Sequence, residues 1–266
     1  MVTAKQSKPK PTLNLDHQRA IAKDLWDLSN QVFEGTHQAE TEFTRKDYVF
    51  FGLADKARVT FEAIQVLCDK SLIDDAFCLV RTLIEGIING AYVAHKGDEI
   101  ANDYAEFPDY WSWIEFTQLR EVAPETTDQT SQKEVEEMQR KHDAVKGRYI
   151  KFKRGEWCAD NLFQRALALD TAASRDFNLM RALVNLAWRK ASVYVHGTAS
   201  SIVSRVQETD SGIAIKRTYT SEESAGVLFM ANMAMFALVA LVDMRLGKHN
   251  KDTWGQLYDR WAGNEA

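Results

Sequence analysis

Three side chains suited to proton transfer and phosphate binding recur at helical spacing in the segment RKASVYVHG, residues 189–197. Seven residues of an α-helix advance about 700°, about 20° short of two turns, so Arg189 and His196 share a face about 10 Å apart. Ser192 lies between them. An imidazole titrates near neutral pH, and a guanidinium can hold a phosphate through two parallel hydrogen bonds. The stripe predicts either phosphodiester chemistry or a polar network that satisfies only its own members.

A second polar stripe interrupts the apolar segment FCLVRTLIEGIINGA, residues 77–91, where Arg81, Glu85 and Asn89 recur at intervals of four. An arginine four residues before a glutamate can form an ion pair along a helix. Because the neighbouring residues are mostly apolar, little of this helix is expected to face water. The stripe predicts either an ion pair that braces a helical bundle or one wall of a functional site.

Together the two stripes could cleave RNA without a metal ion. That reaction needs a base to take the 2′-hydroxyl proton and a cation to stabilise the charge that builds on the phosphorane. His196 is the candidate base, and either Arg189 or Arg81 is the candidate phosphate ligand. Glu85 would orient an arginine or the imidazole, and Ser192 could donate to a phosphate oxygen. The expected product carries a 2′,3′-cyclic phosphate.

The sequence lacks the motifs of several other kinds of active site. The sequence has no glycine-rich phosphate loop, no HExxH motif and no cysteine–histidine cluster with zinc-ligand spacing. We therefore expect no metal ion and no cofactor. The three cysteines, Cys68, Cys78 and Cys158, are odd in number, and we interpret them as reduced thiols of a cytoplasmic protein.

A basic segment could dock RNA. The stretch KHDAVKGRYIKFKRG, residues 141–155, has six lysines and arginines, one acidic residue and two interleaved aromatic rings. Positive charge combined with aromatic stacking suits single-stranded RNA. The alternative is an ordinary solvated helix face. The candidate RNA-binding residues are Lys146, Arg148, Tyr149, Lys151, Lys153 and Arg154.

The composition predicts an all-α protein. The chain of 266 residues has only 13 glycines and 4 prolines, and no proline follows Pro124. The formal net charge of −5 argues against a protein that coats nucleic acid non-specifically, but it allows a local basic groove. Residues 225–242 carry no charge over a length close to a bilayer span. Five alanines and Asn232 in this segment favour a buried core helix, and we expect no membrane.

The hydrophobic periodicity gives the expected elements. Residues 46–68 and 72–95 are predicted to form an antiparallel helical hairpin, and Pro108 is expected to divide residues 99–120 into two short helices. Two β-prone runs around TDSG predict a small β-hairpin insertion near residues 201–219. Further helices are expected at 16–33, 131–153, 162–169, 175–196 and from 221 to 244, with a closing amphipathic turn at 252–261. Residues 1–13 are interpreted as a disordered basic tail, and 14–266 as a single helical domain with its core bundle at about 46–246.

The chain resembles HEPN domains, compact helical bundles that often act as metal-independent ribonucleases. Arg189 and His196 match their Arg-x(4–6)-His signature. The RTLIE segment and the Ser-x3-His-Gly helix end also resemble a bacterial helical family linked to HEPN-like toxins and phage defence. The resemblance implies a HEPN-like bundle, an RNA-cleaving effector of a bacterial defence or toxin system, a homodimer, and a partner protein of that system. Lys190 stands where these enzymes usually have a small polar residue, so Arg81 could supply the positive charge instead.

Two other functions remain open at this point. A non-catalytic scaffold of the same fold could use Arg81, Glu85 and His196 to bind a nucleotide or a partner. Alternatively, these side chains could form a purely structural Arg/Glu/His network in the core of the bundle.

Overall fold

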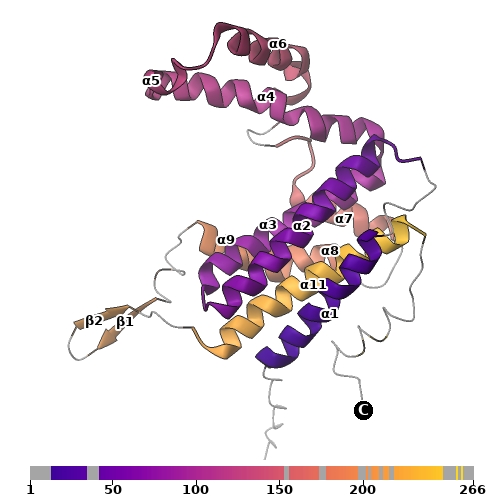
Figure 1. Ribbon diagram of the computed structural model, residues 1–266, viewed down its shortest axis with the longest axis vertical. Coiled ribbons are helices and arrows are strands. Elements are labelled where there is room, and N and C mark those ends of the chain that lie inside the picture. Colours follow the sequence, from indigo (N-terminus) through magenta and orange to yellow (C-terminus); the bar gives the residue numbers. More distant parts are fainter. Residues whose placement is uncertain are drawn as a thin grey trace, which may run out of the picture. The chain divides into compact units, whose positions relative to one another are not determined.

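The computed structural model confirms an all-α protein with one small β-hairpin (Figure 1). The structure describes residues 13–34, 42–152, 156–173, 178–196, 202, 205–209, 212–215, 219–247, 256 and 259. Most of the closing turn expected at 252–261 and most of the predicted tail at 1–13 lie outside these residues. The likeness of the bundle to HEPN domains stays a prediction.

The helices and strands follow this order: α1 (Leu15–Glu34), α2 (Arg45–Asp69), α3 (Ile73–Lys96), α4 (Asp98–Val122), α5 (Pro124–Thr127), α6 (Gln132–Tyr149), α7 (Leu162–Ala172), α8 (Leu179–Ala182), the π-helix η2 (Leu183–Trp188), α9 (Arg189–Val195), β1 (Val206–Thr209), β2 (Gly212–Ile215) and α11 (Ser221–Arg245).

The chain divides into two compact units. Unit 1 comprises Met1–Ala39, Lys56–Glu85 and Asn185–Ala266, and unit 2 comprises Glu40–Asp55 and Gly86–Val184. The helices α2, α3 and η2 each contribute one part to each unit. The single domain expected for residues 14–266 stays a prediction.

The centre of unit 1 is α11, which packs along α1. Its side chains are buried on nearly every side, from Ala225 to Val242. The helix begins with a capping box, in which the hydroxyl of Thr220 accepts from the backbone N–H of Glu223 and the Glu223 carboxylate accepts from the backbone N–H of Thr220. Burial on nearly every side explains why α11 has no polar face.

One polar pair crosses the apolar contact between α1 and α11. The amide Nδ2 of Asn232 donates to both the backbone oxygen and Oε1 of Gln18, each at 3.0 Å. Both residues are buried, at 1% and 3% exposure. A buried amide is tolerated only when it is hydrogen-bonded, so Asn232 fixes which part of α1 lies against it.

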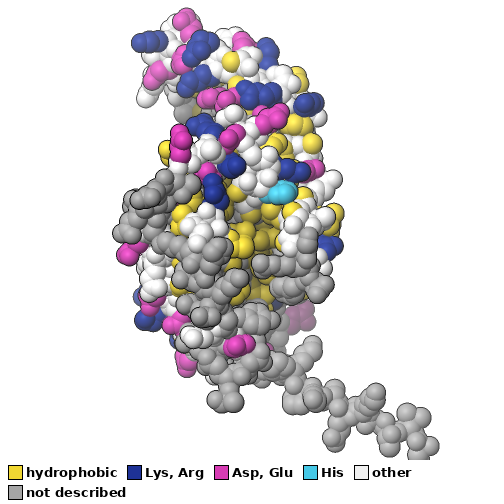
Figure 2. Space-filling view, turned by 90° about the vertical axis from the view of Figure 1, so that its right-hand side faces the viewer, with side chains coloured by type: hydrophobic (Ala, Val, Ile, Leu, Met, Phe, Trp, Pro, Cys, Tyr) yellow, Lys and Arg dark blue, Asp and Glu magenta, His cyan; other side chains and the backbone are white. Residues whose placement is uncertain are grey.

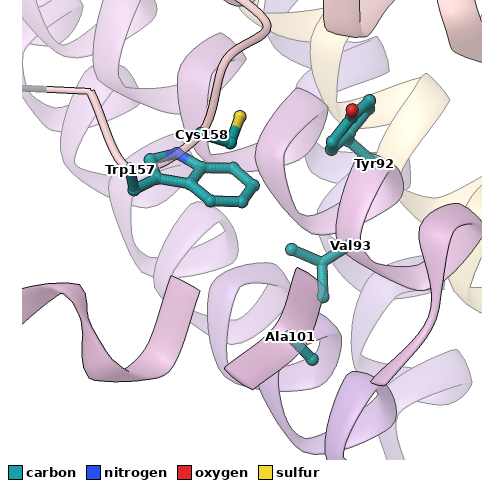
Figure 3. Close-up of a cluster of buried hydrophobic side chains, with 5 residues drawn as sticks. All are labelled: Tyr92, Val93, Ala101, Trp157 and Cys158. Atoms are coloured by element: carbon teal, nitrogen blue, oxygen red, sulfur yellow. The ribbon is translucent and has the colours of Figure 1, made fainter. Parts of the chain in front are cut away.

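The core of unit 2 contains an aromatic and aliphatic cluster that closes on the loop before α7. It consists of Tyr92, Val93, Ala101, Trp157 and Cys158 (Figure 3). The Tyr92 hydroxyl donates to Asp160 Oδ2 at 2.5 Å, and burial, followed by the Asp160 carboxylate, raises the pKa of this phenol. The cluster therefore joins the C-terminal half of α3 to the start of α4 and to the loop at 156–161.

The expected division of α4 at Pro108 is wrong, because residues 98–122 form one continuous helix. A proline in a helix interior removes one N–H donor and crowds the preceding turn. Packing against α6 compensates for this loss. The rings of Phe107 and Tyr110 lie 5.4 and 5.3 Å from the ring of Tyr149.

The β-hairpin is confirmed, with strands shorter than the segment in which it was expected. The strands are antiparallel, and Val206 pairs with Ile215 and Thr209 with Gly212. Arg205, just before β1, forms an ion pair with Asp74 at the start of α3. This pair ties the base of the hairpin to the helix that also carries Arg81.

Among the helices that the structure describes, two, α3 and α11, are long and apolar enough to cross a membrane by length and composition alone. This is weak evidence, since most of the apolar stretch of each is buried within the protein and core helices pass the same test.

Replacing Gln18 with Ala should lower the free energy of unfolding by about 1–3 kcal/mol, because the buried Asn232 amide loses an acceptor. Denaturant unfolding followed by circular dichroism measures this change. The matched control is Gln31→Ala, at an exposed position of the same helix, which should alter stability by less than about 0.5 kcal/mol. Equal effects of the two substitutions would show that the buried amide pair contributes nothing.

Candidate functional site

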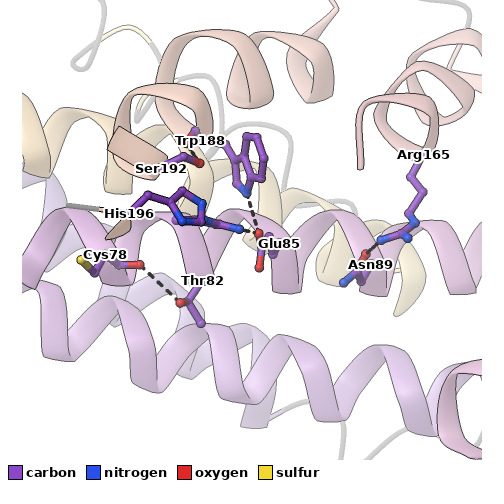
Figure 4. A network of polar contacts seen from close by, with 9 residues as sticks. Cys78, Thr82, Glu85, Asn89, Arg165, Trp188, Ser192 and His196 are labelled. Carbon is purple, nitrogen blue, oxygen red and sulfur yellow. Dashed lines mark hydrogen bonds and ion pairs between the residues drawn. The ribbon is translucent and has the colours of Figure 1, made fainter. Parts of the chain in front are cut away.

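Three of the residues singled out from the sequence meet within unit 1. Nη1 of Arg81 lies 2.9 Å from Nε2 of His196, and Nε of Arg81 donates to Oε1 of Glu85 at 3.0 Å. Arg81 and Glu85 lie one turn apart on α3, as predicted, while His196 comes from the end of α9. Figure 4 shows His196 and Glu85 turned toward each other from these elements. Two separate helices thus bring a guanidinium, a carboxylate and an imidazole together.

These side chains remain accessible to solvent. The side chain of Arg81 is 22% exposed and that of Glu85 37% exposed, and His196 is exposed. Leu83, on the opposite side of α3, is fully buried, and so is its neighbour Ile84. The amphipathic spacing of α3 therefore buries one side of the helix and leaves the Arg81–Glu85 side where a polar ligand can reach it.

Trp188 is a fourth member of the site that the sequence analysis missed. Its indole Nε1 donates to Oε1 of Glu85 at 2.7 Å, and the guanidinium of Arg81 lies 4.9 Å from the centre of its ring. Oε1 of Glu85 thus accepts from both neighbours, and Arg81 is held by an ion pair and by a cation–π contact. Trp188 itself was the signal in the sequence, because the N–H of a partly buried indole requires an acceptor.

Trp188 is the last residue of a π-helix, which spacing arguments based on 3.6 residues per turn do not anticipate. Single π-turns within helices are frequent at functional sites and change which side chains share a face. Here η2 directly precedes α9, so the chain passes from the indole to His196 within eight residues. The π-turn carries Trp188 to α3, and the C-terminal end of α9 carries His196 to the same helix.

A stacked pair of rings holds α9 against α3 one turn before Arg81. Phe77 and Tyr194 lie with ring centres 4.2 Å apart and planes inclined by 7°. Phe77 is buried, and burial raises the pKa of the Tyr194 phenol, with smaller contributions from the carboxylates of Asp74 and Glu223. Since Tyr194 lies two residues before His196, this stack sets the separation at which the imidazole meets Arg81.

The contact with Arg81 defines the state of the imidazole. A guanidinium has only donors, so Nε2 of His196 must accept when the two atoms lie at hydrogen-bond distance. Such a hydrogen bond forms only with a neutral ring that carries its proton on Nδ1. A neutral imidazole is the form that can take a proton from a hydroxyl group.

The other two residues of the opening stripe do not join this cluster. Arg189 is exposed and has no hydrogen bond or ion pair with the residues that the structure describes. The Ser192 hydroxyl donates to the backbone oxygen of Trp188 at 2.8 Å, within its own helix. Arg189 and His196 were expected about 10 Å apart along one face, and no direct contact joins them, because two helical turns separate their positions on α9. Of the two arginines considered as the phosphate ligand, Arg81 is the one that lies beside His196.

The described part of the predicted RNA surface is largely engaged within unit 2. Lys146 pairs with Asp143, and Arg148 pairs with Asp103 and Glu106. Lys151 lies 5.3 Å from the ring of its neighbour Phe152. Figure 2 shows acidic and basic side chains interspersed on one face of the molecule. Lys153 and Arg154 lie outside the described residues.

Tyr149 corrects the expectation of an aromatic stacking platform. Its side chain is only 2% exposed, and its hydroxyl donates to the backbone oxygen of Asp103 at 2.6 Å. A ring that stacks on a nucleobase must offer an open face, and this ring packs between α4 and α6 instead. Burial raises the pKa of Tyr149 to about 12.

Asn89, the third residue of the α3 stripe, belongs to a different network, in unit 2. Its Oδ1 accepts from Nη1 of Arg165 at 2.8 Å, and Nη2 of Arg165 donates to Oε2 of Glu156 at 2.6 Å. The Arg165 side chain is 4% exposed and lies over the ring of Trp157. This buried arginine braces the core of unit 2.

No metal centre is evident in the part of the chain that the structure describes, where no three histidine, cysteine or acidic side chains are arranged to hold an ion. Cys68 and Cys158 are buried, and burial is the main cause of the raised pKa of both thiols. Cys78 is partly exposed on α3, and burial and then the nearby Asp75 and Asp74 raise its pKa.

Removing the Tyr194 ring in a Tyr194→Ala variant should lower the free energy of unfolding by about 1–3 kcal/mol, because the half-buried stack on Phe77 is lost. The matched control Tyr194→Phe keeps the ring and should stay within about 0.5 kcal/mol of the parent. Thermal unfolding measures both variants. A loss in the phenylalanine variant as large as that in the alanine variant would show that the hydroxyl, rather than the stack, stabilises this contact.

Comparison with known proteins places the chain in one family. None of the curated proteins matches it significantly, and none of the solved structures does. A family match covers residues 47–213, more than half of the chain, and includes Arg81, Glu85, Trp188 and His196. The chain belongs to the family of unknown function DUF5677.

Proposed function

We propose that this protein is a metal-independent RNA endonuclease whose reacting groups are His196 and Arg81. One observation carries the proposal: the His196 imidazole and the Arg81 guanidinium, from different helices, lie in direct contact, 2.9 Å apart, among partly exposed side chains. A base and a phosphate ligand side by side are the two groups that this reaction requires. Effector activity in a bacterial defence or toxin system, the homodimer, the partner protein and the cytoplasmic location stay predictions.

In the proposed reaction, Nε2 of His196 takes the proton of a 2′-hydroxyl group. The 2′-oxygen then bonds to the adjacent phosphorus, and the bond from phosphorus to the 5′-oxygen breaks. The leaving 5′-oxygen takes a proton from the imidazolium, which returns to its neutral form. The products are a 2′,3′-cyclic phosphate and a free 5′-hydroxyl, so no metal, oxidant or second substrate is consumed.

Arg81 would bind the scissile phosphate through its Nη groups while its Nε stays on Glu85. A guanidinium suits this role because its fork of donors matches two phosphate oxygens and remains charged at any physiological pH. Glu85 and Trp188 act as positioning residues, since they hold the guanidinium by its Nε and by its face. A fixed donor costs less reorganisation when charge develops on the phosphate.

Purified protein should cleave single-stranded RNA in the presence of a chelator and leave 2′,3′-cyclic phosphate ends. His196→Ala should reduce the rate by about 10²–10⁴-fold, the usual contribution of a general base. The control is His95→Ala, at an exposed position of α3, which should cleave at the parent rate. Product ends are identified by mass spectrometry.

The same variant separates the other functions. A purely structural network predicts that His196→Ala lowers the melting temperature and that the parent does not cleave. A nucleotide-binding scaffold predicts weaker binding by the variant and, again, no cleavage by the parent. Cleavage by the parent that persists undiminished in His196→Ala would contradict the proposed base.

The two arginines provide a second test of the site. Arg81→Ala should lower the cleavage rate by about 10²-fold or more, because charge on the phosphorane loses its ligand. Arg189→Ala should cleave within about twofold of the parent, because a substitution at an exposed, unpaired position perturbs little. Rate measurements on the two variants under one set of conditions decide between them. A larger loss of cleavage rate in Arg189→Ala than in Arg81→Ala would show that Arg189, not Arg81, binds the phosphate.

A further inference from the structure

The base proposed for catalysis is already occupied in the free protein. Nε2 of His196 has one lone pair, and the N–H of Arg81 Nη1 lies on it. A nitrogen whose lone pair accepts one hydrogen bond cannot at the same time take a proton from a substrate hydroxyl. While the hydrogen bond from Arg81 is in place, Nε2 of His196 is therefore unable to act as the catalytic base.

We propose that an oxyanion opens the site by drawing Nη1 of Arg81 away from His196, so that ligand binding itself creates the free base. This inference rests on the proposed function and adds its regulation. The trigger is the phosphodiester of the substrate or any other oxyanion that can accept two hydrogen bonds from a guanidinium. The imidazole stays unreactive until such an anion arrives.

The contacts of Arg81 are arranged for this exchange. Its Nε is held by Glu85 at 3.0 Å, and its face lies 4.9 Å from the centre of the Trp188 ring. Neither contact uses the Nη groups. A small change in the position of the guanidinium can therefore move Nη1 from the imidazole to an anion while the ion pair and the cation–π contact persist.

The exchange favours a charged acceptor over the imidazole. A hydrogen bond from a guanidinium to an anionic oxygen is roughly twice as strong as one to a neutral acceptor. A phosphate also offers two oxygens in the geometry of the guanidinium fork, whereas Nε2 of His196 offers a single lone pair. The half-exposed Glu85 carboxylate offsets the charge of Arg81, so an anion must compete with it as well.

Glu85 sets how readily the site opens. With Glu85 in place, the charges of the carboxylate and the guanidinium cancel locally, and anions bind weakly. Glu85→Gln keeps an oxygen that can accept from Arg81 but removes the negative charge. The variant should bind an oxyanion more tightly, by about threefold to tenfold for a half-exposed pair worth about 1 kcal/mol.

Nitrogen NMR of the histidine side chains in the intact protein tests the exchange directly. At mildly alkaline pH and without added anion, His196 should carry its proton on Nδ1, and Nε2 should show the resonance of a hydrogen-bonded, unprotonated nitrogen. Adding sulfate should move the Nε2 resonance downfield as the donor leaves, whereas chloride at equal ionic strength should not. His196→Ala identifies the resonance.

Four further measurements, three with variants and one with a dinucleotide, make the result decisive. In Arg81→Ala, the Nε2 resonance should already lie at the downfield position and should not respond to sulfate. In Glu85→Gln, the same shift should appear at a lower sulfate concentration, while Arg189→Ala should titrate like the parent. A dinucleotide with a 2′-O-methyl group at the scissile position should reproduce the shift, and a shift with this probe alone would identify the nucleotide as the trigger.

The proposal is overturned if His196 carries its proton on Nε2 in the free protein, or if neither sulfate nor the dinucleotide moves its Nε2 resonance. This readout is independent of cleavage. A shift without RNA cleavage would retain the anion exchange and refute the nuclease. Cleavage with an unmoved Nε2 resonance would retain the nuclease and refute the exchange.

Discussion

The hydrogen bond between the Arg81 guanidinium and Nε2 of His196 is the interaction on which the proposed chemistry of this protein depends. A guanidinium cannot accept a hydrogen bond, so the contact requires a neutral imidazole with a defined tautomer. It also requires two helices from distant parts of the chain to meet at hydrogen-bond distance. Every other contact of the cluster either positions one of these two groups or holds their helices together.

The positioning contacts differ in kind, and each controls a different degree of freedom. The ion pair with Glu85 holds one end of the guanidinium, and the ring of Trp188 holds its plane. The stack of Phe77 on Tyr194 sets the distance between the two helices. Because polar contacts orient groups and apolar contacts bring their helices together, the cluster needs both to stay assembled at the surface.

The other buried polar contacts of the protein take no part in this cluster. The apolar helix α11 is buried on nearly all sides and is registered against α1 by the Asn232–Gln18 pair. Networks in unit 2, such as the one centred on Arg165, satisfy buried charge locally. The polar contacts described above thus fall into two classes: buried ones within the core, and partly exposed ones such as those of Arg81 and Glu85.

The sequence alone determined much of the fold, because helix formation depends on local spacing and on the residues that begin and end each helix. The capping boxes at Ser131 and Thr220, the hairpin of α2 and α3 and the small β-hairpin all follow from residues near one another in the chain. The Arg81–Glu85 ion pair was predicted for the same reason, since four residues make one helical turn.

Only the tertiary structure decided which of these residues meet across helices. The spacing placed Arg189 and His196 on one face, yet the residue that contacts His196 is Arg81, which comes from another helix. Packing also kept α4 continuous through Pro108 and buried the ring of Tyr149, which the sequence pattern had placed on a binding surface. Local spacing fixes neighbours along one helix, but the partner of a side chain on another helix depends on how the apolar faces pack.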